Sequence, residues 1–236
     1  MLLLALTLLA APTASRPVGL RFDQTTVVRI DGKVQGSGVT SRVYRSGSRL
    51  RLEPGDGEGA ALLLHLDTGK AWRLFPDTRT AVAIDVDAVR AKAQMDASSA
   101  AEAMGAPSEE SVRSRDLGTS RTVAGRACQD HRVTAPGLTL DVCLDRSAPV
   151  GIEAFTDFLE WSGAASALAP VLDSVRRLAG FPLETRYRVK ALGRNWETTQ
   201  VLTRIEFGPQ PRALFEVPSD FSITSETTDS DGGTPQ

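Results

Sequence analysis

The sequence predicts an α+β fold built on an antiparallel sheet, and three patterns support this class. Between residues 18 and 86, short runs alternate apolar and polar side chains and are separated by turn residues such as Asp31-Gly32. Residues 87–104 and 155–178 instead repeat apolar side chains at helical spacing. Two-residue alternation then returns near the C-terminus, so strands precede and follow the helical segments.

Composition limits the functional classes. The chain has 236 residues, of which 41% are hydrophobic and 24% charged, so it can bury a core. Its net charge of −2 provides no electrostatic basis for gripping a phosphate backbone, which disfavours a nucleic-acid partner. With two histidines and two cysteines, few metal ligands are present, and we expect neither a metal nor a cofactor.

The first 15 residues are predicted to be a secretory signal peptide. Residues 1–11 are almost all apolar, too few to cross a bilayer, and Ala14 or Ser15 suits cleavage. No Lys or Arg precedes the run, and a buried N-terminal strand or helix is the alternative. No cysteine follows it to carry a lipid. We therefore expect a periplasmic or secreted protein with no membrane span after cleavage.

The remaining chain divides into short strands and two helical regions. Strands are expected at 18–30, 39–44, 49–53, 61–67, 71–75, 80–86, 121–134 and 138–145, around 187–189, and at 201–207. No repeat of fixed period is present. The acidic, Ser/Thr/Gly-rich residues 222–236 are predicted to be a disordered tail.

The helical regions differ in character. Asp87 suits the N-cap of helix 87–104, whose apolar stripe is mostly alanine, so it should pack weakly as a mobile cover or a marginal surface helix. The polar residues 105–118 are expected to be a linker. Within 155–178, Pro170 interrupts the pattern and should start a second helix, which Gly180 would cap.

The only two cysteines, Cys128 and Cys143, flank the turn residues Pro136-Gly137. Two-residue alternation places both on the polar side of one hairpin, close enough for a disulfide, which fits an oxidising compartment. A turn centred on Pro136-Gly137 would leave them diagonal, so we expect a bulge or a longer loop.

Two stretches resemble a known family. Residues 38–86, which include Asp67-x-Gly69-Lys70-x-Trp72-x-x-x-Pro76, and the run Gly208-Pro209-x-Pro211-x-x-Leu214-Phe215-x-Val217-Pro218 are similar to the periplasmic lipoprotein carriers LolA and LolB and their exported relatives of unknown function. The resemblance implies one half-barrel domain over residues 16–221. It would be a strongly curved antiparallel sheet, an incomplete barrel, with helices covering the concave face.

The resemblance also implies a cavity that holds acyl chains. Its lining would comprise Leu62, Leu64, Leu66, Trp72, Leu74, Val82, Ile84, Phe155, Phe158 and Leu172. These side chains could equally form an ordinary core. Arg45 occupies the place of the carrier arginine that fastens a lid helix, although the proline that follows it in the carriers is Ser46 here.

No motif for catalysis is found. The sequence lacks the Gly-x-Ser-x-Gly nucleophile elbow and the phosphate-binding glycine patterns. His65 is expected to be solvated or packed, and His131 to be a satisfied core histidine. Asp85 and Asp87 suit a strand end and helix cap better than a Ca²⁺ site.

The predicted function is therefore non-catalytic binding of a lipid or lipid-modified polypeptide in a concave sheet. The partners would be lipid or lipoprotein acyl chains, and another envelope protein is a further candidate. The alternative is an envelope interaction or sensor module with a filled core and no ligand.

Overall fold

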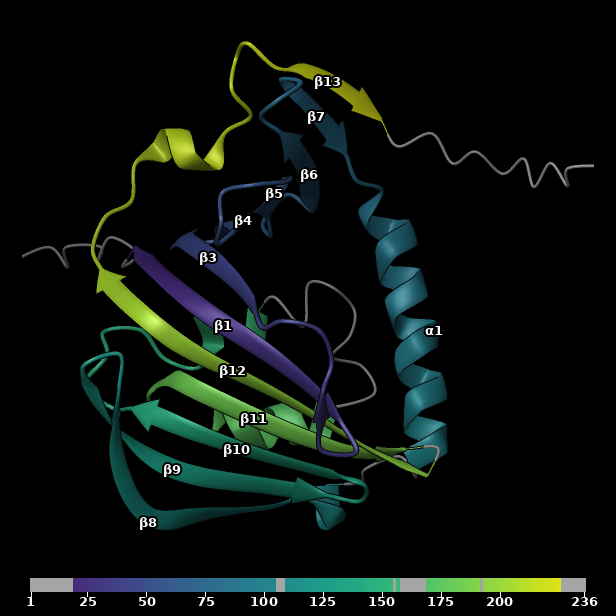
Figure 1. Ribbon diagram of the computed structural model, residues 1–236, viewed down its shortest axis with the longest axis vertical. Coiled ribbons are helices and arrows are strands. Elements are labelled where there is room, and N and C mark those ends of the chain that lie inside the picture. Colours follow the sequence, from purple (N-terminus) through teal and green to yellow (C-terminus); the bar gives the residue numbers. More distant parts are fainter. Residues whose placement is uncertain (1–18, 105–108, 155, 158–168, 192, 226–236) are drawn as a thin grey trace, which may run out of the picture.

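A computed structural model describes residues 19–104, 109–154, 156–157, 169–191 and 193–225. The predicted signal peptide lies outside these residues. A large curved, unclosed sheet dominates the fold (Figure 1). In chain order the strands are β1 (Leu20–Ile30), β2 (Lys33–Val34), β3 (Val39–Ser46), β4 (Arg49–Pro54), β5 (Ala61–His65), β6 (Lys70–Phe75), β7 (Thr80–Ala83), β8 (Arg113–Val123), β9 (Arg126–Ala135), β10 (Leu138–Asp145), β11 (Phe181–Ala191), β12 (Arg194–Phe207) and β13 (Ser222–Ser225).

The sheet joins the two halves of the chain through β1. The strand order is β13-β7-β6-β5-β4-β3-β1-β12-β11-β10-β9-β8, with β2 paired to β1 beyond the end of β3. Neighbours are antiparallel except β13 and β7, which are parallel. The predicted antiparallel sheet is thus confirmed, with one parallel pair added at its edge.

Helix α1 (Val86–Met104) lies across the concave side of this sheet (Figure 1). It follows β7 and contacts β11, which lies seven strand steps away. Nineteen helical residues span about 28 Å, whereas seven strand spacings cover about 34 Å along the sheet. A straight helix can connect the two strands only as a chord across the bend.

The expected weak packing of α1 is confirmed. Val86 is buried against β4, β5 and β6, but Val89 and Met95 are exposed. The N-cap is Asp85 rather than Asp87, because the Asp85 carboxylate accepts a hydrogen bond from the backbone N–H of Ala88 at 3.0 Å.

The second helix described, α3 (Ala169–Arg176), begins beside Pro170 as predicted and packs on β9. Val171 and Val175 join a cluster with Val133, Val142 and other side chains of β9 and β10. Gly180 is not its cap, since the helix ends at Arg176. Instead, a Cβ at Gly180 would lie 2.8 Å from the carbonyl oxygen of Asp145, and φ is +119° there.

Two segments that lack an apolar pattern are strands nevertheless. Part of the predicted linker belongs to β8, which starts at Arg113. Part of the predicted tail, residues 222–225, forms β13, and residues 226–236 lie outside the description. Both strands are largely exposed and are held by backbone hydrogen bonds at the two sheet edges. Because few of their side chains are buried, their sequences do not alternate apolar and polar residues, and this alternation is what predicts a strand.

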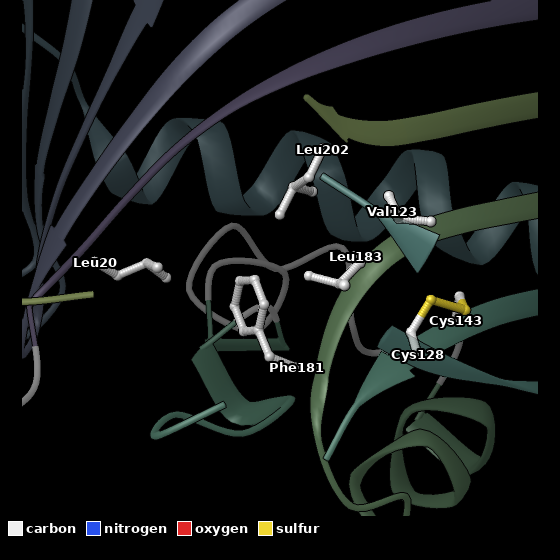
Figure 2. Packing of buried hydrophobic residues seen from close by; sticks show 7 residues of the cluster. All are labelled: Leu20, Val123, Cys128, Cys143, Phe181, Leu183 and Leu202. Carbon is white, nitrogen blue, oxygen red and sulfur yellow. A yellow bond between two sulfur atoms is a disulfide. The ribbon is translucent and has the colours of Figure 1, made fainter. Parts of the chain in front are cut away.

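Among the described residues, four apolar clusters support the sheet. Figure 2 shows the one at the bend, formed by Leu20, Val123, Cys128, Cys143, Phe181, Leu183 and Leu202. On the outer face of β5–β7, the short 3-10 helix η3 (Arg212–Phe215) inserts Phe215 among Ala61, Leu63 and Leu74. A second 3-10 helix, η1 (Glu109–Ser111), precedes β8.

Candidate functional site

The concave face of β4–β7 contains the first part of the candidate site. Leu62 faces Leu52, and Leu64 faces both Leu50 and Ala71. Leu66 and Ile84 pack against the same cluster, which Val86 of α1 completes. Val82 shares this face by register, since both Val82 and Leu62 are paired with Arg73. Five of the predicted lining residues are therefore together, namely Leu62, Leu64, Leu66, Val82 and Ile84.

Trp72 and Leu74 are not part of this face. They are paired with Leu63 and Ala61, and their side chains belong to the outer cluster around Phe215. The prediction that they share a face with Leu62 was wrong because of the hairpin loop. Residues 66–69 connect His65 to Lys70, and this loop length pairs even-numbered residues of β5 with odd-numbered residues of β6.

The predicted residues of the second helical region are only partly described. Phe155 and Phe158 lie outside the described residues. Leu172 is buried on α3, in the half of the molecule that contains β9.

The concave face continues into β1, β11 and β12, which the predicted lining did not include. Leu140, Tyr187, Thr198 and Val28 form one row across β10, β11, β12 and β1, and Leu138, Val189, Trp196 and Ile30 form the next. Tyr187 is 42% exposed and Trp196 40% exposed, which is unusual for aromatic side chains on strands that are paired on both sides. The alternation of Tyr187 and Val189 with arginines was the available sequence signal.

Arg45 connects the sheet to the segment after β10. Its side chain is 14% exposed and points to the concave side, in register with Leu20 and Leu50. Nη1 donates to the Ala154 carbonyl oxygen at 2.5 Å, and Nη2 donates to Asp157 Oδ2 at 2.6 Å. Nε donates to the Gly47 carbonyl oxygen at 3.1 Å. The arginine thus holds Ala154 and Asp157 against β3.

A cavity of about 500 Å³ adjoins this contact. Arg45, Leu66, Asp67, Arg90 and Asp157 line it together with Gly47 and Ser48. It brings Arg45 of the predicted contact and Leu66 of the predicted lining into one place, beside the first turns of α1.

The predicted disulfide between Cys128 and Cys143 is present, with a Cα–Cα distance of 5.3 Å. Cys143 is opposite Asp130, so the cysteines are diagonal, but the expected bulge or longer loop is absent. Pro136 and Gly137 form a two-residue connection between Ala135 and Leu138, and Gly137 has φ +67°. The twist of a hairpin shortens one diagonal, which explains how the bond forms without a bulge.

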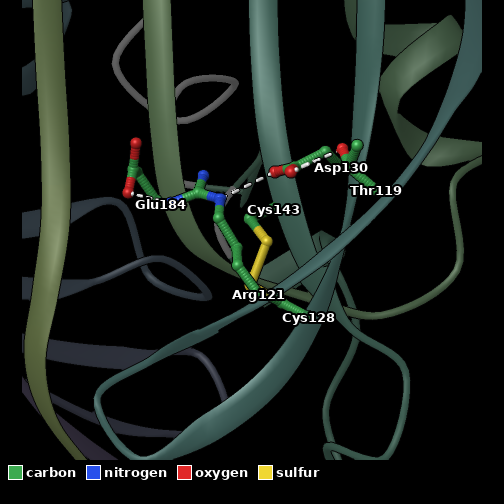
Figure 3. The surroundings of a disulfide bond; sticks show 6 residues. All are labelled: Thr119, Arg121, Cys128, Asp130, Cys143 and Glu184. Carbon is green, nitrogen blue, oxygen red and sulfur yellow. Dashed lines mark hydrogen bonds and ion pairs between the residues drawn. A yellow bond between two sulfur atoms is a disulfide. The ribbon is translucent and has the colours of Figure 1, made fainter.

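An arginine lies over this disulfide (Figure 3). Arg121 Nε donates to Asp130 Oδ1 at 3.0 Å, and Nη1 donates to Glu184 Oε2 at 2.5 Å. Burial acts to lower the pKa of Arg121, but the hydrogen bonds that it donates to Glu184 and Asp130 outweigh burial, and the pKa is raised. The polar face predicted for the cysteines is confirmed, although both are buried beneath its charges.

The two histidines lie on strands of the sheet, His65 on β5 and His131 on β9. His65 Nε2 is 2.7 Å from the Phe215 carbonyl oxygen, and its ring packs edge-on against Trp72. His131 is buried, but its Nε2 has no hydrogen-bond partner among the described residues, so it is not the satisfied core histidine expected.

No group of three or more His, Cys, Asp or Glu side chains is placed to hold a metal ion among the described residues. Within the same ranges, no helix has both the length and the apolar character needed to cross a bilayer.

Comparisons with known proteins identify a family. No curated protein matches the chain. Among solved structures, PNGF-II in space group C2 has a TM-score of 0.36 at 10% identity, covering 89% of this chain and 31% of that chain. The chain therefore spans about a third of the length of PNGF-II.

Two further structures are covered over most of their length. A domain named for outer membrane lipoprotein sorting, from Vibrio parahaemolyticus, has a TM-score of 0.32 at 14% identity, covering 83% of this chain and 88% of that chain. A DUF1329 family protein from Desulfovibrio piger has a TM-score of 0.31 at 11% identity, covering 86% of this chain and 91% of that chain.

These TM-scores are all below 0.5, so family membership rests on the sequence model alone. The model for a domain of unknown function, DUF4412, matches residues 62–221, which is more than half of the chain. The matched range extends from β5 to the residue before β13 and includes the disulfide and the outer cluster around Phe215. The chain belongs to the DUF4412 family.

Proposed function

We propose that the protein is a non-catalytic binding protein that holds an apolar ligand, an acyl chain of a lipid or of a lipid-modified polypeptide, against the concave face of its sheet. The observation that carries the proposal is the set of incompletely covered apolar side chains on that face. Leu52, Leu62, Val82 and Ile84 are half-buried at one end, and Tyr187 and Trp196 are exposed at the other.

The position of α1 supports this proposal. A chord across the bend contacts the sheet mainly at its ends, which leaves apolar side chains of the face for another molecule to cover. Covering them releases about 25 cal/mol for each Å² of apolar surface, so such a ligand needs few polar contacts.

Arg45 fits the role of a fastener at the margin of the same face. It holds residues 154–157 by charge-assisted hydrogen bonds, and the adjoining cavity is lined by side chains of β3, α1 and the 154–157 segment. The disulfide supports a periplasmic or secreted location, because such bonds persist in oxidising compartments.

The test combines recovery of a native ligand with binding of a defined probe. We expect native mass spectrometry of gently purified protein to show bound lipid. We also expect dansyl-undecanoic acid to bind with a blue-shifted emission. Tyr187→Glu should weaken this binding at least tenfold, because it places a charge on the concave face.

Ile223→Glu is the matched control. Ile223 is an exposed apolar residue of the same kind, but it lies on the edge strand β13. The proposal is overturned if the wild-type protein is repeatedly ligand-free and does not bind the probe, or if both variants weaken binding equally. Those outcomes favour an interaction module with a filled core.

A further inference from the structure

A second apolar and charged surface lies at one end of the sheet, where three connections meet. We define the tip as residues 29–34, 134–139, 188–191 and 193–197, which are the β1–β2 hairpin, the β9–β10 turn and the ends of β11 and β12. In Figure 1 these ends lie together near the C-terminal end of α1. The backbone N–H of Lys190 donates to the Gly137 carbonyl oxygen, and that of Asp31 donates to the Asn195 carbonyl oxygen, so the three segments are held in contact.

The tip is basic although the chain is not. Its three segments contain five basic and two acidic side chains, whereas the whole chain has a net charge of −2. Arg29 is paired with Glu197, and Arg194 is paired with Asp31. Lys33 and Lys190 are both exposed and form no ion pair within the described ranges. They are therefore available to an external anion.

A cavity of about 460 Å³ lies within the tip. Its lining includes Thr134, Thr139, Arg188 and Lys190, which carry hydroxyl, guanidinium and ammonium groups. Glu197 lines it as well, and its carboxylate is paired with Arg29. Arg188 donates from Nη2 to Asp141, but its buried Nε has no partner among the described residues. This set of donors is suited to a phosphate group, which accepts several hydrogen bonds and carries negative charge.

Apolar side chains stand at the rim of the same cavity. Trp196 lines it and is 40% exposed, and Val34, 51% exposed, is paired with Arg29, another lining residue. A tryptophan beside lysines is the combination that membrane–water interfaces favour, because the indole ring enters the headgroup layer while the cations meet lipid phosphates.

We propose that the tip docks on an anionic phospholipid bilayer, with lipid phosphate groups in the cavity and Trp196 and Val34 in the headgroup layer. Charge complementarity selects the bilayer over a neutral surface, and the exposed tryptophan selects it over a soluble anion. The proposal does not depend on a ligand being held on the concave face. Trp196 belongs to both surfaces, but Lys33 and Lys190 belong to the tip alone, so the lysine variants test the tip separately.

The test is co-sedimentation of the full chain with vesicles. One set contains phosphatidylcholine and phosphatidylglycerol at 7:3, and the other contains phosphatidylcholine only. All variants carry the same N-terminal segment, so its contribution to partitioning cancels.

We expect the wild-type protein to bind the anionic vesicles, and we expect this binding to weaken in 0.5 M NaCl. Lys33→Gln and Lys190→Gln should each lower the partition coefficient about fivefold, the factor expected for one basic residue near an anionic surface. Trp196→Ala should lower it on both vesicle types.

Lys92→Gln and Arg79→Gln are the matched controls, because both residues are highly exposed but lie outside the tip. They should bind like the wild type, and circular dichroism should show that all variants are folded. Equal binding of the wild type to both vesicle types, equal losses in tip and control variants, or displacement by inorganic phosphate at constant ionic strength would each overturn the proposal.

Discussion

Arg45 Nη2 on β3 donates to Asp157 Oδ2 at 2.6 Å, across 112 residues of sequence. The same guanidinium donates to the Ala154 carbonyl oxygen, so one side chain fixes two points of the segment that follows β10. Residues 154–157 are thereby attached to the first half of the sheet, although the strands before and after them belong to the second half.

Arg45→Gln should release this segment. Charge-assisted hydrogen bonds contribute about 1.5–3 kcal/mol each, so amide hydrogen exchange over residues 152–157 should accelerate at least tenfold, as measured by mass spectrometry. Arg42→Gln is the control on the same strand, because its ion pair with Asp23 is partly exposed and lies within the first half of the sheet. Unchanged exchange in Arg45→Gln would show that other contacts hold the segment.

The double variant Cys128→Ala/Cys143→Ala should unfold at a lower denaturant concentration than the wild type. The bond closes a loop with a sequence separation of 15, which corresponds to about 3 kcal/mol of stability in the chain-entropy model. Urea unfolding of the oxidised wild type, the reduced wild type and the variant measures this difference. Two titratable thiols in the native protein would contradict the assignment of the bond.

Phe215→Ala should be among the most destabilising single substitutions. Its ring is fully buried on the outer face of β5–β7, where it holds the chain after β12 against the sheet. Removing a buried phenylalanine ring costs about 3–5 kcal/mol, which thermal unfolding would detect. Leu214→Ala, at the partly buried neighbouring position, should cost less.

The stability contributed by Asp145 should depend on pH. Burial opposes ionisation of this carboxyl, but hydrogen bonds from Ser147 and Arg126 outweigh burial and lower its pKa in the folded protein. Its contribution is therefore complete above about pH 4, the unfolded value, and is lost as pH falls through the lowered pKa. Asp145→Asn should reduce the free energy of unfolding at pH 7 and equal the wild type at the acid end.

Asp96→Asn provides the comparison for that pH series. Asp96 is exposed and forms a surface pair with Lys92. If its substitution changed the pH profile as much as Asp145→Asn, the pH dependence would arise from general charge effects rather than from the buried carboxylate.

Alternation and spacing predicted much of the fold. The hairpins of β1–β7, α1 and the disulfide all have strong local signals, because each depends on turn residues, helical period or nearby cysteines. Arg45 was singled out through a family resemblance, and the structure pairs it with Ala154 and Asp157.

Other features depend on pairing that a local pattern does not encode. The face of Trp72 is set by the length of the 66–69 loop, and the burial of Phe215 is set by a segment that returns from the other half of the chain. The position of Tyr187 and Trp196 on the concave face is known only when β11 and β12 are placed beside β10 and β1. Lys33 and Lys190 likewise come to the same end of the sheet only after the strands have paired.

An unclosed sheet ends in strands with one unpaired side, and such edges can recruit other chains into fibrils. β8 counters this hazard with charged residues such as Arg113 and Arg115 and with a break in its ladder between Asp116 and Ser120. At the opposite edge, β13 is four residues long and its side chains are all exposed. Concentrated solutions of the protein should consequently resist edge-to-edge polymerisation, even though the architecture itself invites it.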